Sequence, residues 1–161
     1  MSNLELGPDE SPEVIAAALL TVRDRLVGFV ERCDAGQWAA RPLAGQGDER
    51  PTCVIADHVA DAYRYIGEWI PQIVAGGSVE VDSRVVDALN AQHAERAQGV
   101  AREEVVQHLR SEGDDFAALV RSLSDQDLAL GEGRVGRLAK IGLLHTGGHL
   151  QELEDSLGPP G

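Results

Sequence analysis

Basic residues are scarce in this 161-residue chain, which has 14 Lys and Arg against 27 Asp and Glu and a net charge of −13 with neutral histidines. Binding to nucleic acid or to an anionic membrane would begin against electrostatic repulsion, so we expect neither partner. Aromatic residues make up only 4% of the chain. Because sheet proteins are rich in aromatic and β-branched residues, this composition favours packed helices over a β-sandwich or barrel.

Long hydrophobic runs and a cysteine framework are also missing. The longest strictly apolar run, Val14–Leu20, is too short for a membrane span and follows no basic segment of the kind found in signal peptides. The two cysteines, Cys33 and Cys53, match neither a disulfide framework nor a zinc ribbon, which is typical of a reducing compartment. The sequence therefore predicts a cytoplasmic protein with buried thiols and one domain over residues 1–161, its core over about residues 11–157.

Four long stretches carry apolar residues at helical spacing, and no stretch alternates as a strand does. Long helices are expected over residues 11–33, 51–73, 102–122 and 137–157, with a short helix around 85–97. Glycine and proline predict loops over residues 34–50 and 131–136, and residues 1–10 are expected to be a loose lead-in. This pattern predicts an all-α fold, a four-helix bundle.

Two histidines four positions apart, His145 and His149, lie in the last predicted helix. This spacing places both side chains on one face, about 6 Å apart, which is close enough to share one metal ion. The last predicted helix carries an apolar stripe that includes Leu138, Ile141 and Leu144, and the pair continues it, so we expect both imidazoles to point into the bundle.

Three glycines surround this pair and together give up about 2–3 kcal/mol of helix propensity. They are Gly142, Gly147 and Gly148. Either the close approach of a neighbouring helix or room for a ligand beside the histidines would offset that loss, and the sequence does not choose between them.

His58, in the second predicted helix, is a third candidate to point inward. Three neutral imidazoles would leave at least one coordination position open, as in catalytic zinc sites. Nearby carboxylates could hold the ligand tautomers or act as a base. The candidates for this catalytic role are Asp57 or Asp61 beside His58, and Glu152 one turn after His149.

The competing interpretation is that such a histidine pair arises by chance in a core or on a surface, as is common for this spacing taken alone. His93 and His108 lack the context of the other three histidines. His93 lies in the polar stretch 90–98, and His108 lies at the edge of the third apolar stripe. We expect both of these histidines to be solvated.

Two segments resemble a known family, the DinB-like proteins, which include the mycothiol-dependent maleylpyruvate isomerases and the bacillithiol transferases. They are Cys53-Val-Ile-Ala-Asp-His58-Val-Ala-Asp61 and Leu143-Leu-His145-Thr-Gly-Gly-His149-Leu. The resemblance covers about residues 11–157 and includes the order of the elements. It implies an up-up-down-down helical bundle with a divalent metal ion held by His58, His145 and His149.

One departure from the family pattern is visible at the start of the second helix. Many members have Trp followed by Ser or Thr there, where this chain has Arg50 and Pro51. Neither position is a ligand, so the departure bears on the subfamily more than on the metal.

The resemblance implies a metal-dependent enzyme that uses a low-molecular-weight thiol, of the S-transferase or isomerase type. An open-site ion binds thiolate and lowers the thiol pKa well below about 8.5. Zinc is favoured, with nickel or iron as alternatives. The expected partners are a small-molecule substrate and the thiol, and a homodimer is a candidate assembly. The alternatives are a metal-dependent hydrolase and a non-catalytic metal-binding protein of the bacterial stress response.

Overall fold

The computed structural model describes residues 10–158, and within this range it contains six helices and no strand. The helices are α1 (Pro12–Arg32), α2 (Ala35–Ala39), α3 (Thr52–Val74), α4 (Ser83–Arg96), α5 (Arg102–Ser122) and α6 (Asp125–Leu157). The predicted all-α fold is confirmed. The lead-in expected over residues 1–10 lies, except for residue 10, outside the described residues. No helix in the described range is long and apolar enough to cross a membrane.

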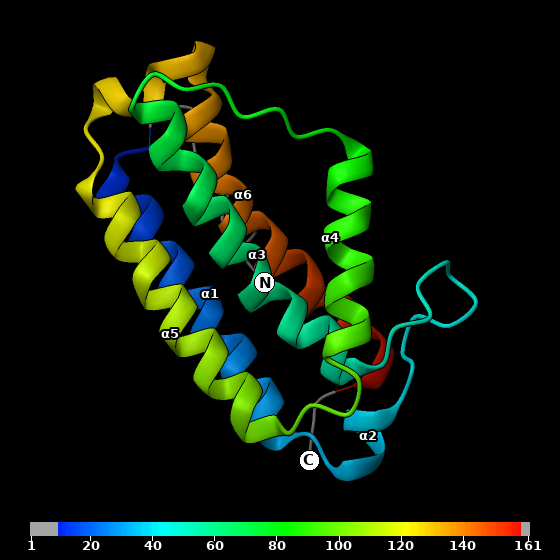
Figure 1. Ribbon diagram of the computed structural model, residues 1–161. Coiled ribbons are helices and arrows are strands. Elements are labelled where there is room, and N and C mark those ends of the chain that lie inside the picture. Colours follow the sequence, from blue (N-terminus) through cyan, green and yellow to red (C-terminus); the bar gives the residue numbers. More distant parts are fainter. Residues whose placement is uncertain (1–9, 159–161) are drawn as a thin grey trace.

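Four of these helices form the bundle, in which α1 and α3 each pack against both α5 and α6 (Figure 1). Pairs of contacting residues give their directions. Glu13 at the start of α1 pairs with Arg121 at the end of α5, so these two helices are antiparallel. Asp57 and His108, each in the first third of its helix, are hydrogen-bonded, so α3 and α5 are parallel.

Arg25 in the second half of α1 pairs with Glu154 near the end of α6, so α1 and α6 are parallel. The bundle therefore runs up-down-down-up, and the expected up-up-down-down order was wrong. The connections explain the difference. A short connection that contains α2 joins α1 to α3 at one end of the bundle, so the chain reverses there. After α3, the extra helix α4 carries the chain back to that same end before α5 begins (Figure 1). The expected loop over residues 34–50 thus holds one short helix, and α4 stands beside the bundle against α3.

The last helix differs from its prediction in where it begins and which face it buries. It begins at Asp125 and is interrupted by non-helical backbone at Leu130–Gly133, so only part of the loop expected over 131–136 is present. Ile141 and Leu144 are 44% and 60% exposed, although the apolar stripe predicted them to be buried. The buried face is instead centred on Ala139, Gly142, Leu143, Thr146, Leu150 and Leu153. Because Gly142 has no side chain, the ring of Phe116 on α5 can lie against the backbone of α6 on this face.

Candidate metal centre

The three predicted ligands meet where the start of α3 lies beside the end of α6. The Nε2 atom of His145 lies 2.9 Å from Nε2 of His58 and 3.0 Å from Nε2 of His149. The ligating atoms of all three residues lie within 4.8 Å of one another. Nitrogens bound at about 2.1 Å to one tetrahedral ion are about 3.4 Å apart. The set is therefore spaced to hold a single ion.

Burial keeps these imidazoles in the neutral form that binds metal. Burial, reinforced by the neighbouring His145 and Arg50, lowers the pKa of His58 to about 2. Burial and the neighbouring His149 lower the pKa of His145 to about 4. The pKa of His149 is also lowered by burial, while the Glu152 carboxylate opposes that shift. No proton has to be displaced from these rings at neutral pH before a metal binds.

The outer nitrogens of the rings are only partly satisfied. Nδ1 of His149 lies 3.2 Å from Oε2 of Glu152, the geometry by which a carboxylate holds a metal-binding tautomer. Nδ1 of His58 and Nδ1 of His145 are buried and have no hydrogen-bond partner among the described residues. Glu152 therefore lies beside His149, the position expected from the sequence for a tautomer-holding carboxylate.

Sequence reasoning missed two charged residues near the three histidines. These residues are Asp48 and Arg50. The guanidinium of Arg50 donates two hydrogen bonds to the carboxylate of Asp48, from Nε to Oδ1 at 2.9 Å and from Nη2 to Oδ2 at 2.7 Å. The positive charge of Arg50 contributes to the lowered pKa of all three histidines, so it acts directly on the centre. The only signal in the sequence was the departure from the family pattern at positions 50 and 51.

The structure does not bring Asp57 or Asp61 to the three histidines. Asp57 is 6% exposed, and its carboxylate accepts hydrogen bonds from Nε2 of His93 at 2.7 Å and Nδ1 of His108 at 2.9 Å. Asp61 pairs with the Arg64 guanidinium at 2.9 Å. Of the three carboxylates predicted for the site, Glu152 therefore lies beside the histidines, while Asp57 and Asp61 line another groove.

His93 also corrects an expectation, because it is buried rather than solvated, with only 3% of its surface exposed. His108 has a side chain that is 59% exposed, as expected, yet its Nδ1 atom is tied to Asp57. Asp57, His93 and His108 lie on three different helices. Their positions in the sequence do not show that they meet, so no sequence signal could have found this group.

The structure supports close helix packing as the reason for one glycine of α6. A Cβ on Gly142 would lie 2.6 Å from Cε1 of Phe116, so this glycine allows the close approach of α5. Gly148 is exposed, and a Cβ there would meet nothing within 4 Å because the position faces solvent. Gly148 therefore gives no evidence for a ligand space beside the histidine pair.

The family comparison covers most of the chain. The model of the DinB superfamily matches residues 18–153, a range that contains all three histidines of the candidate centre. No curated protein and no solved structure gives a match. The match spans far more than half of the chain, which therefore belongs to the DinB superfamily.

Proposed function

We propose that this chain holds a divalent metal ion, with zinc favoured, on His58, His145 and His149, and that it uses the ion to activate a low-molecular-weight thiol. The observation that carries the proposal is the convergence of three neutral imidazoles in a cluster that contains no fourth protein ligand among the described residues. Three nitrogen ligands leave a position open for an exogenous group. When bound there, a divalent ion stabilises a thiolate and supplies a nucleophile at neutral pH.

The residues around the histidines suit this role. Glu152 accepts a hydrogen bond from His149 and so holds that ring with Nε2 toward the centre. Arg50 carries a guanidinium that is half-buried and already engages one carboxylate, that of Asp48. A thiol or acceptor that bears its own carboxylate can exchange with Asp48 on this guanidinium, because Arg binds carboxylates at two points. The substrate class that fits best is therefore a small anionic thiol or acceptor.

The nearby carboxylates favour thiol chemistry over hydrolysis, in which a free carboxylate usually activates water. Glu152 is occupied by His149. Asp48 is occupied by Arg50, whose hydrogen bonds hold the pKa of the Asp48 carboxyl below its usual value and make it a weaker base. A thiol brings its own ionisable proton and needs no such base once the ion has lowered its pKa.

Elemental analysis tests the metal centre. We expect about one divalent ion per chain in the wild-type protein, as three convergent ligands imply. The variants His58→Ala, His145→Ala and His149→Ala should lose most of it, while His108→Ala, which removes an exposed ring on α5, should retain it. Equal losses in all four variants would show that the metal binds adventitiously.

Calorimetry with two probe thiols tests the thiol. We expect 3-mercaptopropionate to bind the metal-loaded protein and release a proton, measured in buffers of different ionisation enthalpy. Arg50→Gln should weaken 3-mercaptopropionate but leave the uncharged 2-mercaptoethanol unchanged. Turnover of esters or amides without thiol binding would assign the protein to metal-dependent hydrolysis, and a loaded protein that does neither would be a non-catalytic metal binder.

A further inference from the structure

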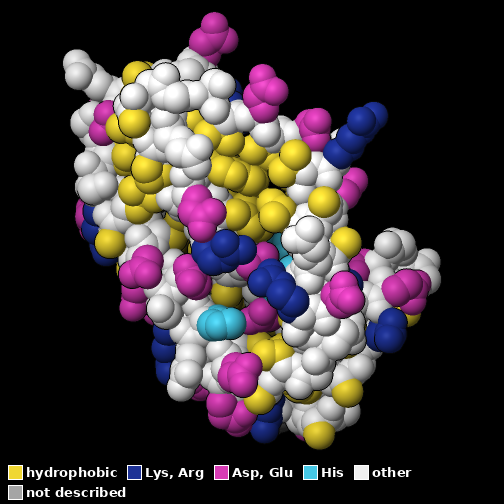
Figure 2. Space-filling view, in the orientation of Figure 1, with side chains coloured by type: hydrophobic (Ala, Val, Ile, Leu, Met, Phe, Trp, Pro, Cys, Tyr) yellow, Lys and Arg dark blue, Asp and Glu magenta, His cyan; other side chains and the backbone are white. Residues whose placement is uncertain are grey.

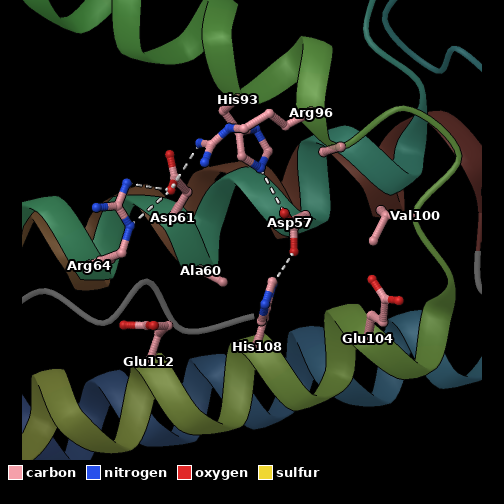
Figure 3. A pocket seen from close by; sticks show the side chains of 11 residues that line it. Asp57, Ala60, Asp61, Arg64, His93, Arg96, Val100, Glu104, His108 and Glu112 are labelled. Atoms are coloured by element: carbon pink, nitrogen blue, oxygen red, sulfur yellow. Dashed lines mark hydrogen bonds and ion pairs between the residues drawn. The ribbon is translucent and has the colours of Figure 1, made fainter.

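A second polar site lies in the groove between α3, α4 and α5, where the structure contains a cavity of about 320 Å³ (Figure 3). Three helices contribute charged side chains to its wall, and Ala60, Ala97 and Val100 supply apolar surface. On the face of the molecule shown in Figure 2, arginine, acidic and histidine side chains gather in the lower half, while hydrophobic side chains gather above them. The cavity shares no lining residue with the three histidines of the metal centre.

Two histidines of the wall are oriented by one carboxylate. His93 from α4 and His108 from α5 both direct a ring nitrogen at Asp57 of α3 (Figure 3). A carboxylate only accepts, so those ring nitrogens donate, and in a neutral imidazole the other nitrogen must then be an acceptor. These acceptors are Nδ1 of His93, which is buried without a partner, and Nε2 of His108, whose side chain is 59% exposed.

The α5 wall adds two acidic side chains to His108. Glu104, His108 and Glu112 are spaced four residues apart, so they follow one face of the helix, and all three line the cavity. Neither glutamate forms a hydrogen bond or ion pair with another described residue. Burial, together with the nearby Asp115, raises the pKa of Glu112, while the charges of Arg64 and His108 only partly oppose that shift.

The two arginines of the groove both lie beside the carboxylate of Asp61. Arg64 pairs with Asp61 at 2.9 Å, and Arg96 lies 3.8 Å from the same carboxylate. The cavity wall therefore has four carboxylates against two guanidiniums when its histidines are neutral. Glu104 and Glu112 are acceptors without a hydrogen-bond partner, and the carboxylates of the wall outnumber its guanidiniums, so the matching ligand is a hydrogen-bond donor with positive charge.

We propose that this groove binds a small linear polyamine. Glu104 and Glu112 are eight residues apart, which corresponds to about 12 Å along the helix axis. An extended triamine of the size of spermidine has a comparable length, so its terminal ammonium groups can reach the two glutamates. Its central nitrogen then lies beside His108, and its methylene segments contact the apolar surface of Ala97 and Val100.

Calorimetric titration with spermidine, above the ordinary pKa of histidine, tests the proposal. The double variant Glu104→Gln/Glu112→Gln should bind spermidine about tenfold more weakly, as the loss of two partly exposed ion pairs predicts. The control Glu80→Gln/Glu103→Gln removes the same charge from two exposed positions outside the cavity and should bind within about twofold of wild type. Circular dichroism checks that both doubles remain folded.

Two further outcomes separate a built site from general attraction to an acidic protein. We expect 1,4-diaminobutane, which is too short to reach both glutamates, to bind more weakly than spermidine, and spermidine to shift the ring resonances of His108. Equal weakening in the two double variants would overturn the proposal. So would stronger binding of succinate than of spermidine by the wild-type protein, which would assign the groove to anions.

Discussion

Gly142 on α6 lies directly against the ring of Phe116 on α5, and a Cβ added to the glycine would be only 2.6 Å from Cε1. The ring has little freedom to move away, because it is 2% exposed and stacks on Tyr63 with ring centroids 5.7 Å apart. This contact sets how closely α6 approaches the rest of the bundle. It lies less than one turn before His145 and so helps to position the metal centre.

Replacing Gly142 and Gly148 with alanine should have opposite effects on stability. Gly142→Ala should lower the free energy of unfolding by about 1–3 kcal/mol, because the new methyl group overpacks the core. Gly148→Ala meets nothing within 4 Å and should raise it by up to about 1 kcal/mol, through helix propensity alone. Urea unfolding of both variants measures the difference. If both variants gained stability, α6 would have to sit farther from α5 than the structure places it.

Asp57 should be a principal polar link between α4, α5 and α3, because its buried carboxylate accepts from His93 and His108. Asp57→Asn presents a donor to one of these donating nitrogens, and we expect a loss of about 1.5–3 kcal/mol of unfolding free energy. Asp114→Asn is the control, because this aspartate also pairs with a buried group, Arg23, but its side chain is 65% exposed. That change should cost about 1 kcal/mol or less in a urea titration. A smaller loss at Asp57 than at Asp114 would contradict the prediction.

The three-histidine cluster was predictable from helical spacing together with the family resemblance. Helical periodicity alone places His145 and His149 on one face, and the family resemblance adds His58. The position of that face was less accessible. Apolar side chains at Ile141 and Leu144 suggested burial, whereas the structure buries the side of α6 on which Gly142 allows a neighbour to approach. A hydrophobicity pattern does not predict this burial, because the close contact depends on a glycine, which has no side chain.

The groove around Asp57 shows a different limit. Its histidines come from α4 and α5, and neither helix identifies its partner by spacing. Their meeting depends on α4 carrying the chain back along the bundle, which makes α5 parallel to α3. Arg50 is a similar case, because a loop residue comes near the three histidines only through the tertiary fold. Sites that form only when helices pack together therefore cannot be predicted from spacing along the chain.

The metal-free protein should lose stability as the pH falls below about 6.5, the ordinary pKa of histidine in an unfolded chain. In the folded protein, burial lowers the pKa of His145 to about 4 and that of His58 to about 2. The unfolded chain therefore binds more protons over this interval, and acid favours unfolding. The stabilisation is fully present above about pH 6.5 and is lost as the pH falls toward the folded pKa values.

Urea unfolding in the presence of a chelator, from neutral pH down to about pH 4.5, measures how the free energy of unfolding falls with pH. This fall reaches at most about 1.4 kcal/mol per pH unit for each group. The His145→Gln variant lacks one of the three rings whose pKa is lowered and should show a shallower decline over the same range. A wild-type midpoint that rises on acidification would mean that the rings are charged in the folded protein.

Removing the metal should lower the melting temperature without unfolding the domain at room temperature. The three histidines lie at one end of the bundle, where α3 begins and α6 approaches its end, while a continuous apolar core joins all four long helices. The core therefore holds the fold without the ion, unlike a zinc finger, in which the metal supplies most of the folding free energy. Bound metal still adds stability by mass action, about 2.7 kcal/mol at a hundredfold excess over the dissociation constant.

Circular dichroism should show the same helix content before and after chelation, with a lower melting temperature after it. The His149→Ala variant should melt at the same temperature with and without the chelator. Loss of the helical signal at room temperature on chelation would show instead that the metal, and not the core, determines the fold.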